Sequence, residues 1–286
     1  MRKLLIATDF SDNATNAVTY GYGLAKQIRA NVTICNAFSV LTELPQASAV
    51  IWPMDGYDTA ISDSVDALAN LKHKLQTDYP AGYQPNIILV NETGNVTDVV
   101  TDTTETHLAE LIVMGTHGDN NISNLLLGNH CRQMIDIATT PLLIVPPTTK
   151  FKAIKKIAYA TDFKNPQDDL ATIYELIRLA KLLNADILLT HVIDDKQESP
   201  TFKKWRDDLL TDLSNKADYP RIYYCTVKSR NAENGLDWLC EHGQVDILTL
   251  LHRPHNIFDK LLRGSVTQTM AKHAAIPLLV LPQTRR

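Results

Sequence analysis

Short apolar runs alternate with helical patterns along the chain. In the first half, the runs cover residues 4–8, 32–38, 87–91, 111–114 and 142–145. Continuous apolar runs of this length are typical of strands in a sheet that helices cover on both faces. Between the first two runs, apolar residues recur at helical spacing from Ala14 to Ile28, and Ser11 is placed to cap that helix. The pattern predicts an α/β fold with a doubly wound, mostly parallel sheet.

The same pattern occurs twice in the chain. The matched segments are RKLLIATDF (2–10) with KKIAYATDF (155–163), LAKQIRANVTI (24–34) with LAKLLNADILL (179–189), and PLLIVP (141–146) with PLLVLP (277–282). Three matches in the same order indicate a duplicated domain, because each repeat is far longer than a solenoid unit. The sequence therefore predicts two tandem domains, residues 1–147 and 153–286, joined by a short polar linker.

Composition and charge exclude some classes of binding partner and indicate the cellular compartment. The formal net charge is −4 and there is no run of Lys and Arg, so we expect no nucleic-acid partner. No apolar stretch approaches the length of a membrane span, and Asp9 interrupts the N-terminus too early for a signal peptide. The four cysteines form no CxxC pair. We therefore expect a cytoplasmic protein with reduced cysteines and no membrane partner.

The most specific feature is the segment MGTHGDNNISNLLLGN, residues 114–129, between an apolar strand and a helical pattern. Its glycines, Gly115, Gly118 and Gly128, have the spacing G-x2-G-x9-G. Glycines after a strand let the backbone approach a ligand, and N–H groups at a helix start favour an anion such as phosphate. The spacing matches neither the dinucleotide fingerprint nor the Walker A loop. A plain turn leading into a helix is the alternative.

Asp9 ends the first predicted strand in the sequence ATD. Ligands of open α/β sheets bind outside the carboxyl ends of the strands, near a switch point in strand order. If the first and fourth strands are neighbours, Asp9 and Gly115 face one crevice. Asp9 can then bind a ribose hydroxyl or help to hold a metal ion bridged to phosphate. The alternative is that its carboxylate caps the turn that follows.

These features resemble the universal stress protein family over essentially the whole chain. The resemblance rests on the ATDF strand ends, the G-x2-G-x9-G loop and the PLLIVP terminal strands. It implies a five-stranded sheet of order 3-2-1-4-5 in each domain. It also implies that residues 142–145 pair with 278–280, so that the two domains form an intrachain pseudo-dimer. The ligand implied is ATP, with or without Mg²⁺, in the first domain. The implied contacts are Ala7, Thr8, Asp9, Ala37, Met114, Gly115, Thr116, His117, Gly118, Gly128, Asn129 and His130.

Two departures from the family pattern change what we expect of ATP and magnesium binding. The family's motif has Ser or Thr after the last glycine, where this chain has Asn129, which lacks a hydroxyl for a magnesium shell. In the second domain, leucine and proline replace the first two glycines of the loop. Only Asp162, Gly264 and Ser265 remain of that site. We therefore expect the second domain to bind ATP poorly or not at all.

The predicted function is that of a cytoplasmic universal stress protein, which binds an adenine nucleotide and acts as a stress-response sensor or regulator. No serine elbow, Cys/His pair, two-carboxylate pattern or zinc spacing occurs, so we expect no metal site and at most slow ATP hydrolysis. One alternative is a nucleotide-free scaffold for an unidentified protein partner. The other is an enzyme with slow ATP-hydrolysing or adenylate chemistry. A homodimer of the whole chain is a further possibility.

Overall fold

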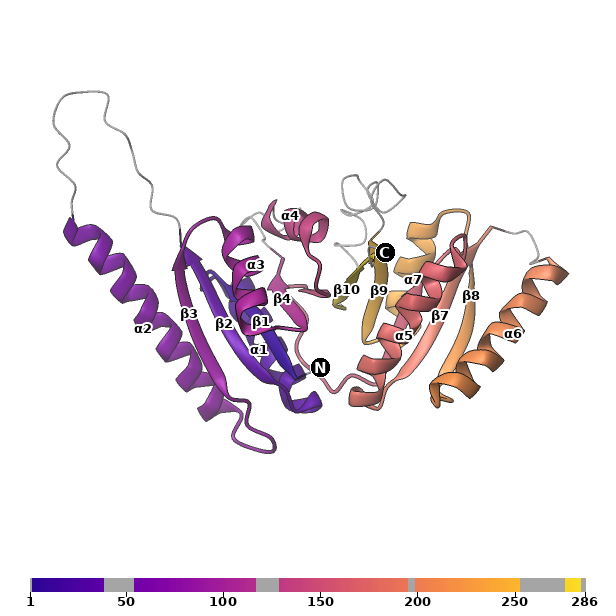
Figure 1. The fold of residues 1–286 in the computed structure, drawn as a ribbon, viewed down its shortest axis with the longest axis horizontal. Helices are drawn as coiled ribbons and strands as arrows, with labels where there is room; N and C mark the ends of the chain where they lie inside the picture. The colour runs from indigo at the N-terminus through magenta and orange to yellow at the C-terminus, as the bar shows by residue number, and fades with distance from the viewer. Residues whose placement is uncertain (1, 39–53, 117–128, 195–198, 253–275, 284–286) are drawn as a thin grey trace, which may run out of the picture.

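The computed structural model describes residues 2–38, 54–116, 129–194, 199–252 and 276–283 (Figure 1). The strands of the first half are β1 (Lys3–Thr8), β2 (Asn31–Phe38), β3 (Ile87–Thr93), β4 (Leu111–Gly115) and β5 (Leu142–Val145). Its helices are α1 (Asp12–Ile28), α2 (Met54–Asp78), α3 (Val96–His107) and α4 (Asn129–Ile137). The five predicted strands of this half are confirmed, with ends shifted by at most two residues.

The second half repeats this order of elements. Its strands are β6 (Lys156–Ala160), β7 (Asp186–Ile193), β8 (Ile222–Lys228), β9 (Ile247–His252) and β10 (Leu278–Pro282). Its helices within the described ranges are α5 (Pro166–Leu183), α6 (Pro200–Ala217) and α7 (Ala232–His242). None of the helices described in either half is long and apolar enough to cross a membrane.

The described strands form one sheet in the order β3-β2-β1-β4-β5-β10-β9-β6-β7-β8. Pairing is parallel within each half, so each half has the predicted order 3-2-1-4-5. The halves join where β5 and β10 pair antiparallel, with Leu143 opposite Leu279. The predicted pairing of the two terminal strands is confirmed, and it places the halves side by side in Figure 1.

Both faces of the sheet are buried. Leu4 and Ile6 of β1 point to a core that α1, α2, α5 and α6 cover across both halves. Leu5 points to the other face, where α3 and α4 cover the first half. A separate core lies under α7 in the second half. Successive strand residues therefore all enter a core, which explains why the strands are continuous apolar runs.

Candidate functional site

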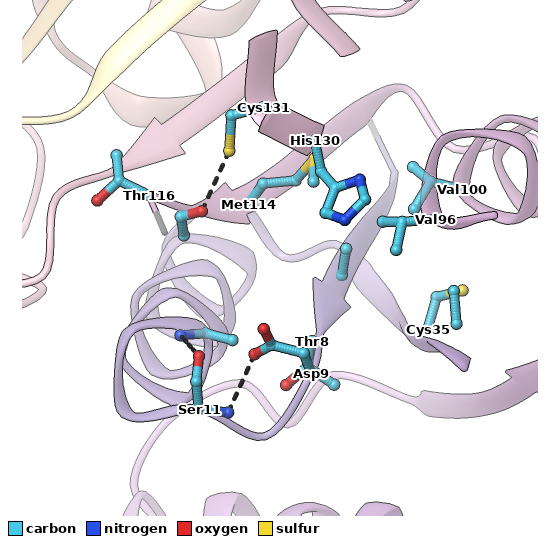
Figure 2. Close-up of a pocket in the computed structure, with 14 residues that line it drawn as sticks. Thr8, Asp9, Ser11, Cys35, Val96, Val100, Met114, Thr116, His130 and Cys131 are labelled. Carbon is cyan, nitrogen blue, oxygen red and sulfur yellow. Dashed lines mark hydrogen bonds between the residues drawn. The ribbon is translucent and has the colours of Figure 1, made fainter. Parts of the chain in front are cut away.

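A cleft opens at the carboxyl ends of β1 and β4 (Figure 2). The chain leaves β1 for β2 on one side, while β4 lies on its other side, so the cleft marks the switch in strand order. The lining residues are Ala7, Thr8, Asp9, Ser11, Ala14, Cys35, Ala37, Val96, Val100, Met114, Gly115, Thr116, His130 and Cys131.

Eight of the twelve site residues expected in the first domain line this cleft: Ala7, Thr8, Asp9, Ala37, Met114, Gly115, Thr116 and His130. Asn129 is the first residue of α4, directly before His130. His117, Gly118 and Gly128 lie outside the described residues, as do Gly264 and Ser265 of the second domain. The parallel sheet therefore brings together every described residue of the expected set except Asn129.

The ATDF motif builds a tight turn from β1 into α1. The Thr8 hydroxyl accepts a hydrogen bond from the N–H of Phe10 at 3.1 Å. The Asp9 carboxylate accepts one from the N–H of Ser11 at 3.0 Å. Phe10 has a φ of 63°, in the left-handed region, and these two bonds hold it there. The Ser11 hydroxyl then accepts from the N–H of Ala14 at 3.2 Å, which confirms the predicted cap.

The second copy of the motif builds the same turn. Thr161 accepts from the N–H of Phe163 at 3.0 Å, and Asp162 accepts from the N–H of Lys164 at 3.1 Å. Phe163 also has a positive φ, 55°. Asp162 forms an ion pair with the Lys164 ammonium at 3.1 Å. Both strand-end aspartates thus have the turn-capping role that was the structural alternative for Asp9, whether or not they contact a ligand.

Gly115 is required for packing as well as for any ligand. A Cβ at this position would lie 2.7 Å from the carbonyl oxygen of Asn13, in the first turn of α1. That distance is far below a van der Waals contact, so a side chain here would push α1 away from β4. The carbonyl of Gly115 in turn accepts a hydrogen bond from the Cys131 thiol of α4 at 3.2 Å. The end of β4 is thereby held between two helices.

The second domain lacks this close approach. Leu251 stands where Gly115 stands in the first domain, and its side chain is buried in the core. α5 begins four residues after Asp162, whereas α1 begins three residues after Asp9. α1 also packs closely on β4, while α5 makes far fewer close approaches to β9. The leucine side chain and the longer turn together separate the strand end from the helix start.

One wall of the cleft has no recognisable signal in the sequence. Val96 and Val100 come from the first turns of α3, and Cys35 and Ala14 come from β2 and α1. Asn95 signals the start of α3, because its side chain accepts from the N–H of Thr97 at 3.2 Å. Nothing in the local pattern indicates that this helix end faces β1.

The two cleft thiols are poor nucleophiles. Burial raises the pKa of Cys131 to about 12, and the charge of Asp9 adds to that effect. Burial also raises the pKa of Cys35, which lies 3.6 Å from the Thr103 hydroxyl. Both thiols therefore stay protonated near neutral pH, which agrees with the absence of a Cys/His pair in the sequence.

The cleft is apolar on one side and polar on the other. Figure 2 shows the His130 ring reaching from α4 towards Val96 and Val100 of α3. The hydroxyl of Thr116 is buried and makes no hydrogen bond within the described structure. The cavity volume is about 70 Å³, space for a few water molecules.

A metal ion would find few protein donors here. In the described part of the chain, no group of three or more His, Cys, Asp or Glu side chains gathers closely enough to hold one. Asp9 supplies the carboxylate that lines the cleft.

The fold and the cleft define a tandem α/β protein with a crevice at the strand-order switch of its first half. The model of the universal stress protein family matches residues 1–146 and again 153–282. The chain therefore belongs to the universal stress protein family, as a tandem member. A search of curated protein sequences returns no match.

Solved structures share this fold. A universal stress protein from Archaeoglobus fulgidus DSM 4304 is 15% identical, with a TM-score of 0.72, over 99% of this chain and 98% of that chain. A protein of unknown function from Pseudomonas aeruginosa PAO1 is 13% identical, with a TM-score of 0.58, over 99% and 93%. A universal stress protein solved in complex with cAMP is 20% identical over 50% of this chain and 96% of that chain, with a TM-score of 0.37. The cAMP belongs to that protein, and at these identities the first two likenesses establish the fold alone.

Proposed function

We propose that this chain binds an adenine nucleotide, ATP, in the cleft of its first domain and acts as a sensor or regulator in a stress response. The observation that carries the proposal is the convergence of β1, β2, β4, α3 and α4 on one cleft with an apolar wall and a polar edge. An adenosine phosphate has the same division, since its base is flat and largely apolar while its ribose and phosphates are polar. The domain limits that we propose are residues 1–147 and 153–286.

Each part of the nucleotide has a group suited to it. Ala37, Val96 and Val100 form the apolar wall for the base. The carboxylate of Asp9 suits ribose hydroxyls, because it can accept the hydrogen bonds that they donate. The start of α4 offers backbone N–H groups to phosphate oxygens beside His130. His117, Gly118, Gly128 and Asn129 are proposed to complete the phosphate site.

Magnesium fits only as a companion of the nucleotide. Mg²⁺ is commonly held by one or two carboxylates together with substrate phosphates and water. Asp9 can supply one carboxylate, and Asn129 offers no hydroxyl. The ion would therefore depend on the phosphates of ATP for most of its ligands.

The second domain is proposed to bind ATP poorly or not at all. Leu251 has a buried side chain at the position where Gly115 lets the start of α1 approach β4 in the first domain. The buried His252 lies next to it, and its Nε2 is 3.8 Å from the carboxylate of Asp136 on α4 of the first domain. This end of β9 is therefore occupied by packing between the domains. We propose that the second domain has a structural role, with a site for a different ligand as the alternative.

Catalysis is not the proposed role. Burial raises the pKa of both cleft thiols, so they stay protonated near neutral pH. ATP hydrolysis, if it is detected, is expected to be slow. The cytoplasm is the proposed compartment because all four cysteines are free. A homodimer stays a prediction, which size measurement in solution will test.

Titration calorimetry of ATP and AMP with magnesium into the purified chain tests the proposal. We expect one site per chain, and a Gly118→Ala variant that has lost it. Asp9→Ala and Asp162→Ala form a matched pair, because both remove the same turn contact in different domains. Asp9→Ala is expected to weaken ATP binding about tenfold or more, and Asp162→Ala to leave it unchanged. No binding at millimolar nucleotide would refute the proposal and favour the scaffold alternative.

A further inference from the structure

The linker between the domains follows one side of α1. The residues of α1 that meet it are Asn16, Tyr20, Gly23 and Gln27, which are spaced so that they lie along one stripe of the helix. Opposite them lie residues 146–154, which the sequence identifies only as a short polar connection. The stripe and this segment form contacts at every turn of the helix.

Asn16 holds the first part of the linker. Its amide nitrogen donates to the carbonyl of Pro146 at 3.1 Å and to the carbonyl of Thr149 at 2.9 Å. Its amide oxygen accepts from the Lys150 ammonium at 2.9 Å. The Asn16 side chain is buried, so three bonds on both ends of its amide replace water.

The middle of the linker is held by an aromatic contact. The ring of Phe151 meets the ring of Tyr20 edge to face, with centroids 5.3 Å apart. The same ring lies on Gly23, where a Cβ would come within 2.4 Å of Phe151 Cδ1. Gly23 therefore leaves a notch in α1 that the ring of Phe151 fills.

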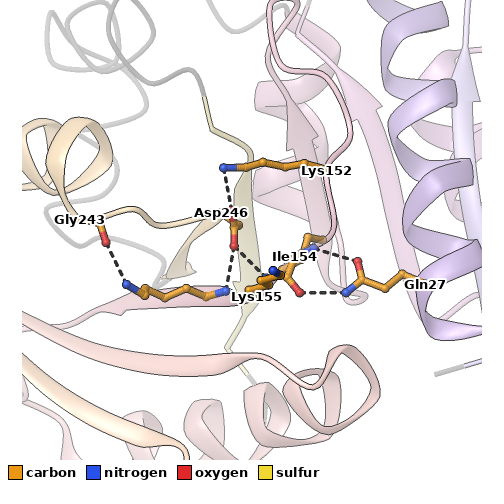
Figure 3. Close-up of polar contacts among 7 residues, drawn as sticks. Gln27, Lys152, Ile154, Lys155, Gly243 and Asp246 are labelled. Carbon is orange, nitrogen blue, oxygen red and sulfur yellow. Dashed lines mark hydrogen bonds and ion pairs between the residues drawn. The ribbon is translucent and has the colours of Figure 1, made fainter.

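Gln27 and Asp246 hold the end of the linker (Figure 3). Gln27 exchanges two hydrogen bonds with the backbone of Ile154, both at 2.9 Å, and also donates to the carbonyl of Leu183 at 3.3 Å. The Asp246 carboxylate lies 2.9 Å from the Lys152 ammonium of the linker and accepts from the N–H groups of Lys155 and Lys156, directly after it, at 2.8 and 2.9 Å. The linker is thus bound to α1 on one side and to the second domain on the other.

The contacts of Asn16, Tyr20, Gly23 and Gln27 with the linker together form a seat for it on α1. The second domain has no counterpart of this seat. The repeat LAKQIRANVTI and LAKLLNADILL aligns the stripe of α1 with Ala171, Glu175, Arg178 and Leu182 of α5. All four of these side chains are exposed, and no described residue covers them. The two helices have the same place in their domains, so the buried stripe of α1 is a feature of the linker and not of the fold.

The seat is continuous with the cleft. Ser11 and Ala14, at the start of α1, line the cleft, and Asn16 follows within one turn. On the strand side, the N–H of Thr116 donates to the carbonyl of Val145 at 3.2 Å, directly before the linker begins. A shift of the α1 start on ligand binding therefore changes the position of the group that holds the linker.

We propose that the seating of the linker on α1 and the occupancy of the cleft are coupled. A nucleotide that fixes the start of α1 also tightens the seat, and so fixes the first domain against the second. This coupling rests on the proposed function, because the ligand of the cleft is the nucleotide proposed above. The contacts of the seat involve protein atoms alone, so the seat can be tested without nucleotide.

Trypsin provides the test, because Lys150, Lys152, Lys155 and Lys156 lie in or beside the linker. Cleavage at these sites is followed by mass spectrometry on the full chain. Gly23→Ala adds the Cβ that collides with Phe151 while it favours the helix, since alanine is the better helix former. The cleavage rate is expected to rise about tenfold, because cutting requires the linker to open locally. The double variant Gly23→Ala/Phe151→Ala has no collision and no ring. Comparing it with Gly23→Ala separates the effect of the collision from the effect of losing the ring contact.

Matched controls come from the second domain. Gln27→Ala is expected to raise cleavage as Gly23→Ala does, whereas Leu182→Ala and Arg178→Ala, at the equivalent positions of α5, leave it within about twofold. If trypsin cleaves the linker of all variants at the same rate without nucleotide, the proposal that α1 holds the linker is wrong. This arm contains no ligand, so its result is independent of the proposed function.

The second arm adds saturating ATP and magnesium. ATP is expected to slow cleavage of the wild-type linker about fivefold or more, because a ligand that favours the seated linker lowers the population of its open form. If ATP binds the wild type and leaves the cleavage rate unchanged, the coupling is wrong and the proposed function stands. If ATP does not bind the wild type, the proposed function and the coupling fail together, while the first arm still decides the seat.

Discussion

Asp246 is the single carboxylate whose removal most directly tests how the domains are joined. Its Oδ2 accepts from two adjacent backbone N–H groups, of Lys155 and Lys156, and its Oδ1 lies 2.9 Å from the Lys152 ammonium. The Asp246 side chain is 10% exposed, whereas that of Lys152 is 69% exposed. Asp246→Asn keeps the shape of the side chain, but it removes the charge and turns one acceptor into a donor that faces Lys152.

The cost of this change follows from the three contacts. A hydrogen bond to a charged acceptor contributes about 1.5–3 kcal/mol and a neutral one about 0.5–1.5 kcal/mol, so each backbone bond loses about 1 kcal/mol. The ion pair with the exposed Lys152 adds at most about 1 kcal/mol. Asp246→Asn is therefore expected to lower the free energy of unfolding by about 2–3 kcal/mol near pH 7.

The pH dependence gives a second signature. Burial alone would raise the pKa of Asp246, but Lys152 and the two backbone N–H groups outweigh burial and lower its pKa below the usual value. A lowered pKa in the folded state stabilises the fold above the unfolded pKa, which is about 4. That contribution is lost as the pH falls from there through the folded pKa. The difference between wild type and variant should therefore be full at pH 7 and shrink below about pH 4.

Urea unfolding at pH 7, 5 and 3, followed by circular dichroism, measures this difference. Asp212→Asn is the control, because Asp212 forms an exposed pair with Lys216 one turn away on α6 and should cost at most about 0.5 kcal/mol. A cost for Asp246→Asn no larger than that of the control at pH 7 would refute the reasoning. So would a cost that is undiminished at pH 3.

Three further predictions concern the cleft and the core beneath α5. Gly115→Ala should destabilise the chain by about 1–3 kcal/mol, because its Cβ meets a backbone oxygen of α1, and should weaken ATP binding; thermal unfolding and calorimetry measure both, and a stable variant contradicts the packing argument. Tyr159→Phe should cost about 1.5–3 kcal/mol in urea unfolding, because it removes a 2.7 Å bond to the buried Asp169 carboxylate; an unchanged midpoint would count against that bond. Cys131 and Cys35 should resist alkylation at pH 7, since burial raises the pKa of both thiols, and rapid labelling by mass spectrometry would contradict their assignment.

Most of the fold could be predicted because its determinants are local. Strands buried on both faces leave continuous apolar runs, and the ATDF motif contains within four residues the hydroxyl and carboxylate that make its turn. The pairing of β5 with β10 was implied by the resemblance to the universal stress protein family, and the structure confirms it. The cleft residues on β1 and β4 followed, because parallel strands end at the same edge of the sheet.

The sequence by itself thus determined two repeated α/β domains and the strand-end residues of one cleft. Only the tertiary structure decided that Val96 and Val100 close that cleft, and that Gly115 is needed for the approach of α1. It alone also decided that Asn16 holds a linker about 130 residues further along the chain. Hydrophobic periodicity tells which side of an element is buried. It does not tell which partner covers that side, because the partner is chosen by packing between segments that are distant in sequence.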